Sequence, residues 1–225
     1  MKSWLLLGLL LGVYFVVESK FYSQCKQDQF VYETFFKDKK DGFFVEIGAD
    51  DGITFSNTLF FEELGWKGIC IEPRPTAFTK LIQNRHCFCD KQAIAAKKGS
   101  REFLVVEGYC QMLSGFVDTY DPVHLQRIKR ELKQFGGTSY VETVPCISFN
   151  ELCDTYNAKK IDLLSVDTEG SELEILKLID FDHIYIQVIV VENLYGSKAI
   201  KELLTKNGYS LVKVLDSDEV YYKPH

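Results

Sequence analysis

Short apolar runs alternate along this chain with longer stretches whose apolar residues recur at helical spacing. The run Phe43–Ile47 has four apolar residues in five and predicts a buried strand. It leads into Gly48 and Gly52, and Ser56 or Asn57 can cap the helical stretch that follows. Strand, glycine loop and helix form the first unit of a nucleotide-binding α/β fold.

The same alternation continues to the C-terminus. Apolar runs predict further strands at 68–71, 87–89, 102–106, 161–166 and 185–191, and a closing antiparallel hairpin at 209–214 and 219–222. Helical spacing predicts helices at 22–37, 76–84, 123–135, 149–156, 172–178 and 197–207. This order predicts one α/β domain over residues 21–225, with about seven mostly parallel strands and helices on both faces of the sheet. The weakly patterned stretch 107–140 suggests a lid or a substrate-recognising surface.

Acidic residues distinguish the glycine loop from a dinucleotide-binding loop. Asp50 occupies the place of the middle glycine and Asp51 follows it, so a pyrophosphate would be repelled. Glu72 ends the second apolar run, where an acid accepts the ribose hydroxyls in such folds. The pattern favours S-adenosylmethionine, which carries an amine and a sulfonium, over a nicotinamide cofactor. An ordinary strand and turn with surface acids is the alternative interpretation.

Composition excludes some partners. The net charge is −6 and no face rich in Lys or Arg stands out, which argues against nucleic acid because its binding depends on phosphate neutralisation. Seven cysteines form no C-x-x-C pair that would suggest zinc, and they do not establish a disulfide framework.

The N-terminal segment Met1–Lys20 differs from the rest of the chain. Its core, Trp4–Val17, carries no charge and follows Lys2. This length is typical of a signal peptide and short for a membrane span, so a cleaved signal and an uncleaved membrane anchor both remain open. Either one predicts entry into the secretory pathway, with the domain secreted or held on a membrane.

Three sequence blocks resemble the FkbM family of S-adenosylmethionine-dependent methyltransferases. The blocks are FVEIGADDGITFSNT, GICIEP and DLLSVDTEGSELEIL, and the similarity extends from about Ser23 to about Asn193. The resemblance implies the Rossmann-like class I methyltransferase fold and O-methylation of a hydroxyl on a sugar, glycan or small molecule. A non-catalytic, membrane-directed binding or regulatory protein that retains the fold is the alternative.

The resemblance also implies the residues that contact the cofactor. They are Glu46, Gly48, Asp50 and Gly52 at the methionine end, Ser56 and Asn57 at its carboxylate, Glu72 at the ribose, and Asp90 to Ala93 at the adenine. A further block, Asp167, Glu169, Gly170 and Glu172, matches the family's D-x-E-G-x-E pattern.

Methyl transfer to a hydroxyl needs a means of removing its proton. The predicted catalytic residues are Asp167, Glu169 and Glu192, of which the first and last end two neighbouring strands. One hypothesis is a carboxylate acting as general base. The other is Mg²⁺ held by Asp167, Glu192 and Asn193, because carboxylate and amide oxygens are the ligands this ion prefers. The oligomeric state is not indicated by any pattern.

Overall fold

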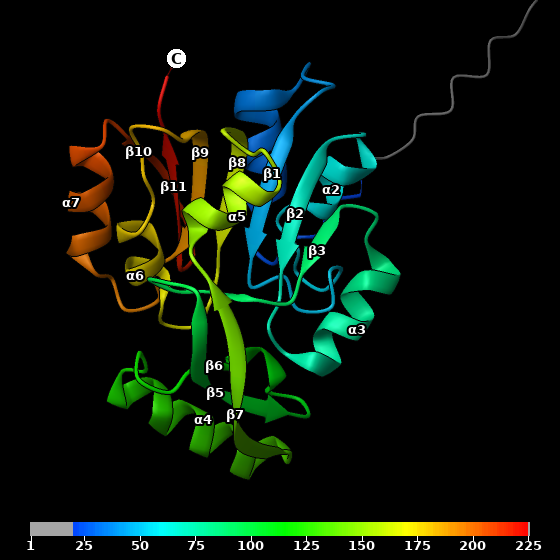
Figure 1. The fold of residues 1–225 in the computed structure, drawn as a ribbon, viewed down its shortest axis with the longest axis vertical. Helices are drawn as coiled ribbons and strands as arrows, with labels where there is room; N and C mark the ends of the chain where they lie inside the picture. The colour runs from blue at the N-terminus through cyan, green and yellow to red at the C-terminus, as the bar shows by residue number, and fades with distance from the viewer. Residues whose placement is uncertain (1–19, 225) are drawn as a thin grey trace, which may run out of the picture.

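A seven-stranded sheet forms the body of the protein in the computed structural model, which describes residues 20–224 (Figure 1). The strand order is β10-β11-β9-β8-β1-β2-β3. The strands are β1 (Phe43–Ile47), β2 (Lys67–Ile71), β3 (Phe88–Asp90), β8 (Lys160–Val166), β9 (Tyr185–Glu192), β10 (Ser210–Leu215) and β11 (Asp218–Tyr222). The first five pair in parallel, whereas β11 pairs antiparallel with both β9 and β10. The expected seven-stranded, mostly parallel sheet is confirmed.

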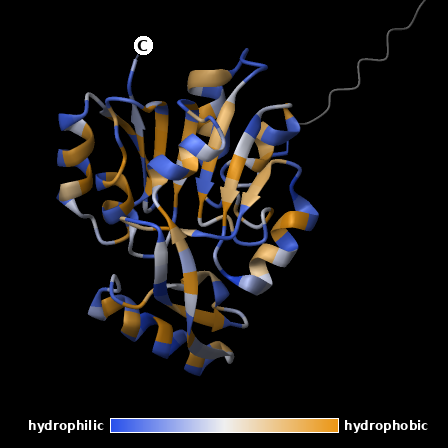
Figure 2. Cartoon of the chain, in the orientation of Figure 1, coloured by the Kyte–Doolittle hydropathy of each residue, from blue (hydrophilic) through white to orange (hydrophobic). Residues whose placement is uncertain are grey.

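Side-chain alternation along the strands creates two apolar faces. In β1, Phe44 packs in one core cluster and Val45 in the other, and both are fully buried. One face is covered by α5 (Phe149–Thr155), α6 (Glu172–Lys177) and α7 (Lys198–Lys206). The other is covered by α1 (Gln27–Val31), the π-helix η1 (Tyr32–Phe36), α2 (Leu59–Glu63) and α3 (Pro75–Asn84). Figure 2 shows apolar residues along the strands of the main sheet and, mixed with polar ones, on the helices beside it.

A second, smaller unit lies beyond the carboxyl ends of the parallel strands (Figure 1). Its sheet has the order β4-β7-β5-β6. The elements are β4 (Ala93–Ile94), β5 (Gly99–Glu107), the 3₁₀ turn η2 (Gln111–Leu113), β6 (Gly115–Phe116), α4 (Pro122–Phe135) and β7 (Thr138–Ile147). The strand expected at 102–106 belongs here rather than to the main sheet, because β5 finds a full-length antiparallel partner in β7. We call this unit, residues 93–147, the insert.

The N-terminal region differs from its prediction. The helix expected over 22–37 begins only at Gln27, because Ser23 forms a β-bridge with Phe55 and bonds to Asp28 through its hydroxyl (2.5 Å). The signal peptide or anchor predicted for residues 1–20 lies, except for Lys20, outside the described residues. Within residues 20–224, no helix has the length and apolar character needed to cross a bilayer.

Candidate active site

A cleft of about 670 Å³ opens between the main sheet and the insert. Its floor consists of Gly48 after β1, Glu72 after β2, Asp167 after β8 and Glu192 at the end of β9. Residues 108–114 of the insert line the opposite side. Open α/β sheets bind their ligands at the carboxyl ends of the strands, so the cleft occupies the expected position.

Glu46 lies beneath the glycine loop and does not line the cleft. Its carboxylate accepts hydrogen bonds from Ser56 Oγ (3.0 Å), the Asn57 amide (2.8 Å), Thr58 Oγ1 (2.8 Å) and Arg85 Nη1 (3.1 Å). Alternation along β1 points this side chain toward the face covered by α2 and α3. Glu46, Ser56 and Asn57 therefore support the loop from behind, in place of the direct cofactor contacts expected for them.

Gly52 likewise lies behind the cleft. It has a φ of 81°, and a β-carbon there would approach Leu81 and Arg85 within 2.7 Å. Gly52 therefore allows α3 to pack closely against the loop, and of the two loop glycines only Gly48 lines the cleft.

Asp50 is paired, not free. It adopts a positive φ of 45° and forms a buried ion pair with Arg74, so its charge is neutralised within the protein. Glu72 accepts hydrogen bonds from the backbone amides of Asp50 (2.9 Å) and Arg74 (2.9 Å), one on each carboxylate oxygen. All three residues line the cleft, and the Glu72 carboxylate is held rigidly while keeping lone pairs for a ligand.

The two residues expected at the adenine separate. Ala93 lines the cleft. Asp90 does not, because its carboxylate accepts hydrogen bonds from the Gln92 amide (2.8 Å) and the Tyr156 hydroxyl (3.1 Å). Asp90 therefore lies outside the cleft lining, whereas Ala93 is in a position to contact an adenine, and both contacts stay predictions.

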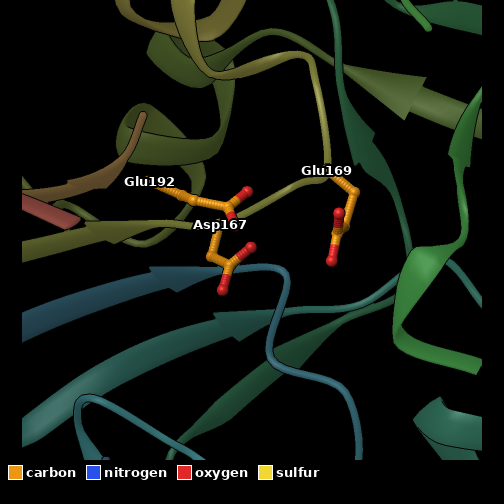
Figure 3. A group of neighbouring side chains, drawn as sticks. All are labelled: Asp167, Glu169 and Glu192. Carbon is orange, nitrogen blue, oxygen red and sulfur yellow. The ribbon is translucent and has the colours of Figure 1, made fainter. Parts of the chain in front are cut away.

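Three carboxylates meet at the ends of β8 and β9 (Figure 3). Asp167, Glu169 and Glu192 each offer an oxygen within 4.8 Å of the others. Asp167 is open to the cleft, whereas Glu169 and Glu192 are partly buried. We call these three residues the carboxylate cluster. It contains all three residues expected from the sequence to be catalytic.

Burial and mutual repulsion make the cluster hard to ionise. Burial and the charge of Asp167 raise the pKa of Glu169 to about 8. Burial and the charge of Glu169 raise the pKa of Glu192 to about 9. Desolvation by the surrounding protein at the floor of the cleft, together with the charge of Glu192, holds the pKa of Asp167 well above its usual range. The three carboxyl groups therefore keep their protons to a higher pH than free carboxyl groups do.

The insert contributes two groups beside the cluster. Arg127 Nη1 and His124 Nδ1, both from α4, lie 3.6 Å from Glu169 Oε2. Burial and the charge of Arg127 lower the pKa of His124. The His124 Nδ1 is 2.9 Å from the hydroxyl of Tyr195, and this contact links the insert to the loop after β9.

Asn193 does not fit the metal-ligand role expected for it. Its amide oxygen accepts from the backbone of Ser197 (2.7 Å), and its amide nitrogen donates to Ser197 O (3.2 Å) and Glu219 Oε1 (3.0 Å). Ser197 and Glu219 therefore already use both the oxygen and the nitrogen of the Asn193 side-chain amide. Among residues 20–224, the carboxylate cluster is the group with metal-ligand spacing, and Glu169 replaces Asn193 in it.

Sequence reasoning missed the cationic residues of the site. Arg74 and Arg85 pair with Asp50 and Glu46, and Arg127 approaches Glu169 from a helix about forty residues earlier in the chain. Arg74 follows the Glu72-Pro73 pair directly, which is a weak signal. Arg127 lies on a predicted helical stretch and Arg85 directly follows one, and a charge at such positions usually indicates a solvated face.

The comparison with protein families identifies this arrangement. Residues 46–211 match the model of the methyltransferase FkbM domain. The chain belongs to the FkbM methyltransferase family. With its strand order and antiparallel edge hairpin, this FkbM methyltransferase has the α/β class I methyltransferase fold.

No curated protein matches this FkbM methyltransferase by sequence. Among solved structures, a TehB-like S-adenosylmethionine-dependent methyltransferase from Corynebacterium glutamicum is 9% identical, covers 90% of this chain and 89% of its own, and gives a TM-score of 0.42. A precorrin-6y C5,15-methyltransferase from Geobacter metallireducens is 14% identical, with coverages of 82% and 81% and a TM-score of 0.35. A chain of a fibrillarin/Nop5p complex is 14% identical, with coverages of 83% and 74% and a TM-score of 0.38. Scores of this size do not bear on substrate or mechanism.

The cleft of the FkbM methyltransferase fits S-adenosylmethionine, the cofactor that the family implies. Glu72 offers fixed carboxylate oxygens for the ribose hydroxyls. Acidic residues outnumber basic ones along the lining, which suits a cofactor carrying a sulfonium and an ammonium group. The ionisable lining residues are Asp50, Glu72, Glu131, Asp167, Glu169, Glu192 and Asp216 against Arg74 and Arg127.

Proposed function

We propose that this methyltransferase transfers a methyl group to a hydroxyl of a sugar, glycan or small molecule, and that the carboxylate cluster removes the hydroxyl proton. The observation that carries the proposal is the state of Glu169. Its Oε2 is buried and has no hydrogen-bond partner among the described residues, yet it belongs to the three-carboxylate group beside the glycine loop. A carboxylate with an unsatisfied oxygen and a raised pKa is suited to accept a proton.

S-adenosylmethionine, when bound, supplies an electrophilic methyl group on its sulfur. Glu72 would hold the ribose, and Gly48 allows the backbone to approach the cofactor because it carries no side chain. Glu169 Oε2 would take the acceptor's proton. Arg127, 3.6 Å away, would stabilise the carboxylate before the proton arrives.

In a second version of this mechanism, the carboxylate cluster binds Mg²⁺. The cluster provides three carboxylate ligands with oxygens within 4.8 Å of one another, and a hard divalent cation prefers such ligands. A cation there would lower the pKa of the acceptor hydroxyl and so reduce the demand on a protein base. The spacing of these three carboxylates is the only observation that supports a metal ion at this site.

The acceptor would enter over β8, β9 and β11, away from the residues assigned to the cofactor. Leu194, which follows β9, lines this part of the cleft and is 41% exposed. An apolar side chain next to Glu192 suits a molecule with both an apolar face and hydroxyl groups. Gln24 lines the cleft as well, and its side chain is exposed for hydrogen bonding to such an acceptor.

The test uses full-length protein, cofactor carrying a labelled methyl group, and panels of neutral glycosides, phenols and amines. Label on a hydroxyl as an ether withstands mild alkali, whereas label on a carboxylate as a methyl ester is released. Alkali-stable label on hydroxyl acceptors is the expected result. Label on amines alone would overturn O-methylation. Cofactor binding without transfer to any panel would favour the non-catalytic alternative.

A further inference from the structure

Two cysteine side chains face each other on the far side of the cofactor loop. Cys70 lies in β2 and Cys87 immediately precedes β3, and their sulfur atoms are 3.5 Å apart. Both are free thiols. Cys70 is fully buried, whereas Cys87 is partly exposed and can meet a reagent from solvent.

Their surroundings give the two thiols different reactivity. The neighbouring thiols of Cys70 and Cys89, together with the charge of Arg85, hold the pKa of Cys87 well below its usual range. Burial raises the pKa of Cys70. The Cys70 thiol donates to Glu46 Oε2 at 3.7 Å, so a proton acceptor stands beside it. Cys87 is therefore a reactive thiol, and Cys70 is a neighbouring thiol that can form a disulfide with it once it is oxidised.

The pair adjoins the residues that hold the glycine loop. Glu46, which accepts from Cys70, is the carboxylate that bonds the segment after the loop. Arg85, two residues before Cys87, donates from Nη1 to Gly52 O at 3.2 Å and to Glu46 at 3.1 Å. A change at the thiols is therefore transmitted to the loop through two direct contacts.

We propose that Cys70 and Cys87 form a reversible disulfide that couples thiol oxidation to the position of the glycine loop. Oxidised glutathione serves as the oxidant. The Cys87 thiolate attacks one sulfur of that disulfide and releases a glutathione thiolate. Cys70 loses its proton to Glu46 and attacks the Cys87 sulfur of the mixed disulfide. The second glutathione leaves, so two protein thiols are oxidised and one glutathione disulfide is reduced to two thiols.

Formation of the Cys70–Cys87 disulfide requires a displacement of the backbone. The sulfur atoms must approach from 3.5 Å to about 2.0 Å. Because β2 is a central strand, the displacement falls mainly on residues 85–87, which precede the short edge strand β3. The hydrogen bond from Arg85 to Gly52 O is then weakened. This readout rests on the proposed function: the oxidised protein binds S-adenosylmethionine roughly tenfold more weakly, the effect of about one hydrogen bond.

Peptide mapping tests the bond without reference to the cofactor. After equilibration of the full chain with oxidised glutathione, free thiols are alkylated and the protein is cleaved with trypsin. Cys70 lies alone in peptide 68–80, whereas Cys87 and Cys89 share peptide 86–91. The expected product joins the two peptides and carries one alkylated cysteine, and reduction separates it. Complete alkylation of all three thiols, or a bond confined to peptide 86–91, would overturn the proposal.

Serine variants assign the partner within peptide 86–91. Cys89→Ser should keep the cross-link and Cys87→Ser should lose it. The reverse pattern would show that Cys70 pairs with Cys89, its neighbour in strand register, and would reject the assignment to Cys87.

Calorimetric titration with S-adenosylmethionine then compares the reduced and oxidised forms. Weaker binding after oxidation, recovered on reduction and absent in Cys87→Ser, supports the coupling. Equal affinity in both forms rejects it. If neither form binds the cofactor while the cross-linked peptide is present, the proposed function fails, and the disulfide, but not its coupling to the cofactor, is established.

Discussion

A β-carbon on Gly48 would lie 1.7 Å from the backbone oxygen of Asp167. The glycine loop after β1 and the end of β8 are therefore in direct contact, with Gly48 at a φ of 88°. This contact joins the part of the cleft assigned to the cofactor to the carboxylate cluster. A backbone atom, not a flexible side chain, therefore limits how closely the two halves of the site can approach each other.

Gly48→Ala should unfold the loop region or the whole domain, because neither backbone can yield by the distance required. Gly65→Ala is the matched control, since Gly65 has a similar φ of 93° and no atom within 4 Å of the added β-carbon. That control carries only the steric cost of a side chain in the left-handed conformation, about 1–2 kcal/mol. Thermal unfolding of both variants measures the difference. Equal stability of the two would show that the contact with Asp167 does not constrain the loop.

Glu72→Gln should weaken S-adenosylmethionine binding. The carboxylate accepts two backbone amides and is positioned to accept the ribose hydroxyls, and each charge-assisted hydrogen bond contributes about 1.5–3 kcal/mol. Glutamine is preferable to alanine here because its amide oxygen still accepts one of the two backbone amides, whereas alanine would leave both unpaired. The exposed α7 variant Glu202→Gln is the control. Calorimetric titration measures affinity, and a well-folded Glu72→Gln protein with unchanged affinity would reject the ribose assignment.

Methyl transfer should accelerate as pH rises through about 8. The pKa of Glu169 is raised to about 8, and only its ionised form can accept the acceptor's proton. The measurement is kcat/KM between pH 6 and 10 for the parent protein and Glu169→Gln. The variant should lose this rise. An unchanged profile in the variant would transfer the base role to another group.

The same pKa shift predicts a decrease in stability with pH. Folding raises the pKa of Glu169 from 4.5 to about 8, so between these values the folded state binds more protons than the unfolded state. The free energy of unfolding therefore falls as pH rises across this window and levels off above it. Chemical unfolding at several pH values should show a smaller fall for Glu169→Gln than for the parent protein.

Chelation distinguishes the two forms of the proposed mechanism. If Mg²⁺ binds the carboxylate cluster, exhaustive chelation should abolish methyl transfer and added Mg²⁺ should restore it. S-adenosylmethionine binding, followed in parallel, controls for damage to the protein. Full activity after chelation would exclude the metal and leave the carboxylate as the base.

Residues Met1–Lys20 should direct a fused cytosolic reporter into the secretory pathway or onto a membrane, because their core is uncharged and apolar. Cell fractionation and protease protection locate the reporter. A fusion lacking Trp4–Val17 is the control. A reporter that remains in the cytosolic fraction would remove the targeting prediction.

The sequence by itself determined the order of elements and the place of the site. Strands such as Phe43–Ile47 and Tyr185–Glu192 are recognisable because they are short apolar runs rich in β-branched or aromatic residues. Asp167 and Glu192 were predicted to converge because residues that end neighbouring parallel strands reach the same edge of the sheet. Such inferences need only the local pattern and the rules of sheet topology.

Only the tertiary structure decided which acids face the cleft. Glu46 and Glu72 both belong to the strand–loop pattern, yet one turns toward Arg85 behind the loop and the other lines the cleft. Asp50 is neutralised by Arg74, and the Asn193 amide is used by its own turn. These outcomes depend on partners distant in sequence or on the geometry of a loop. The role of a carboxylate depends on the groups that surround it in the folded protein. Its position in the sequence does not show which distant groups these are.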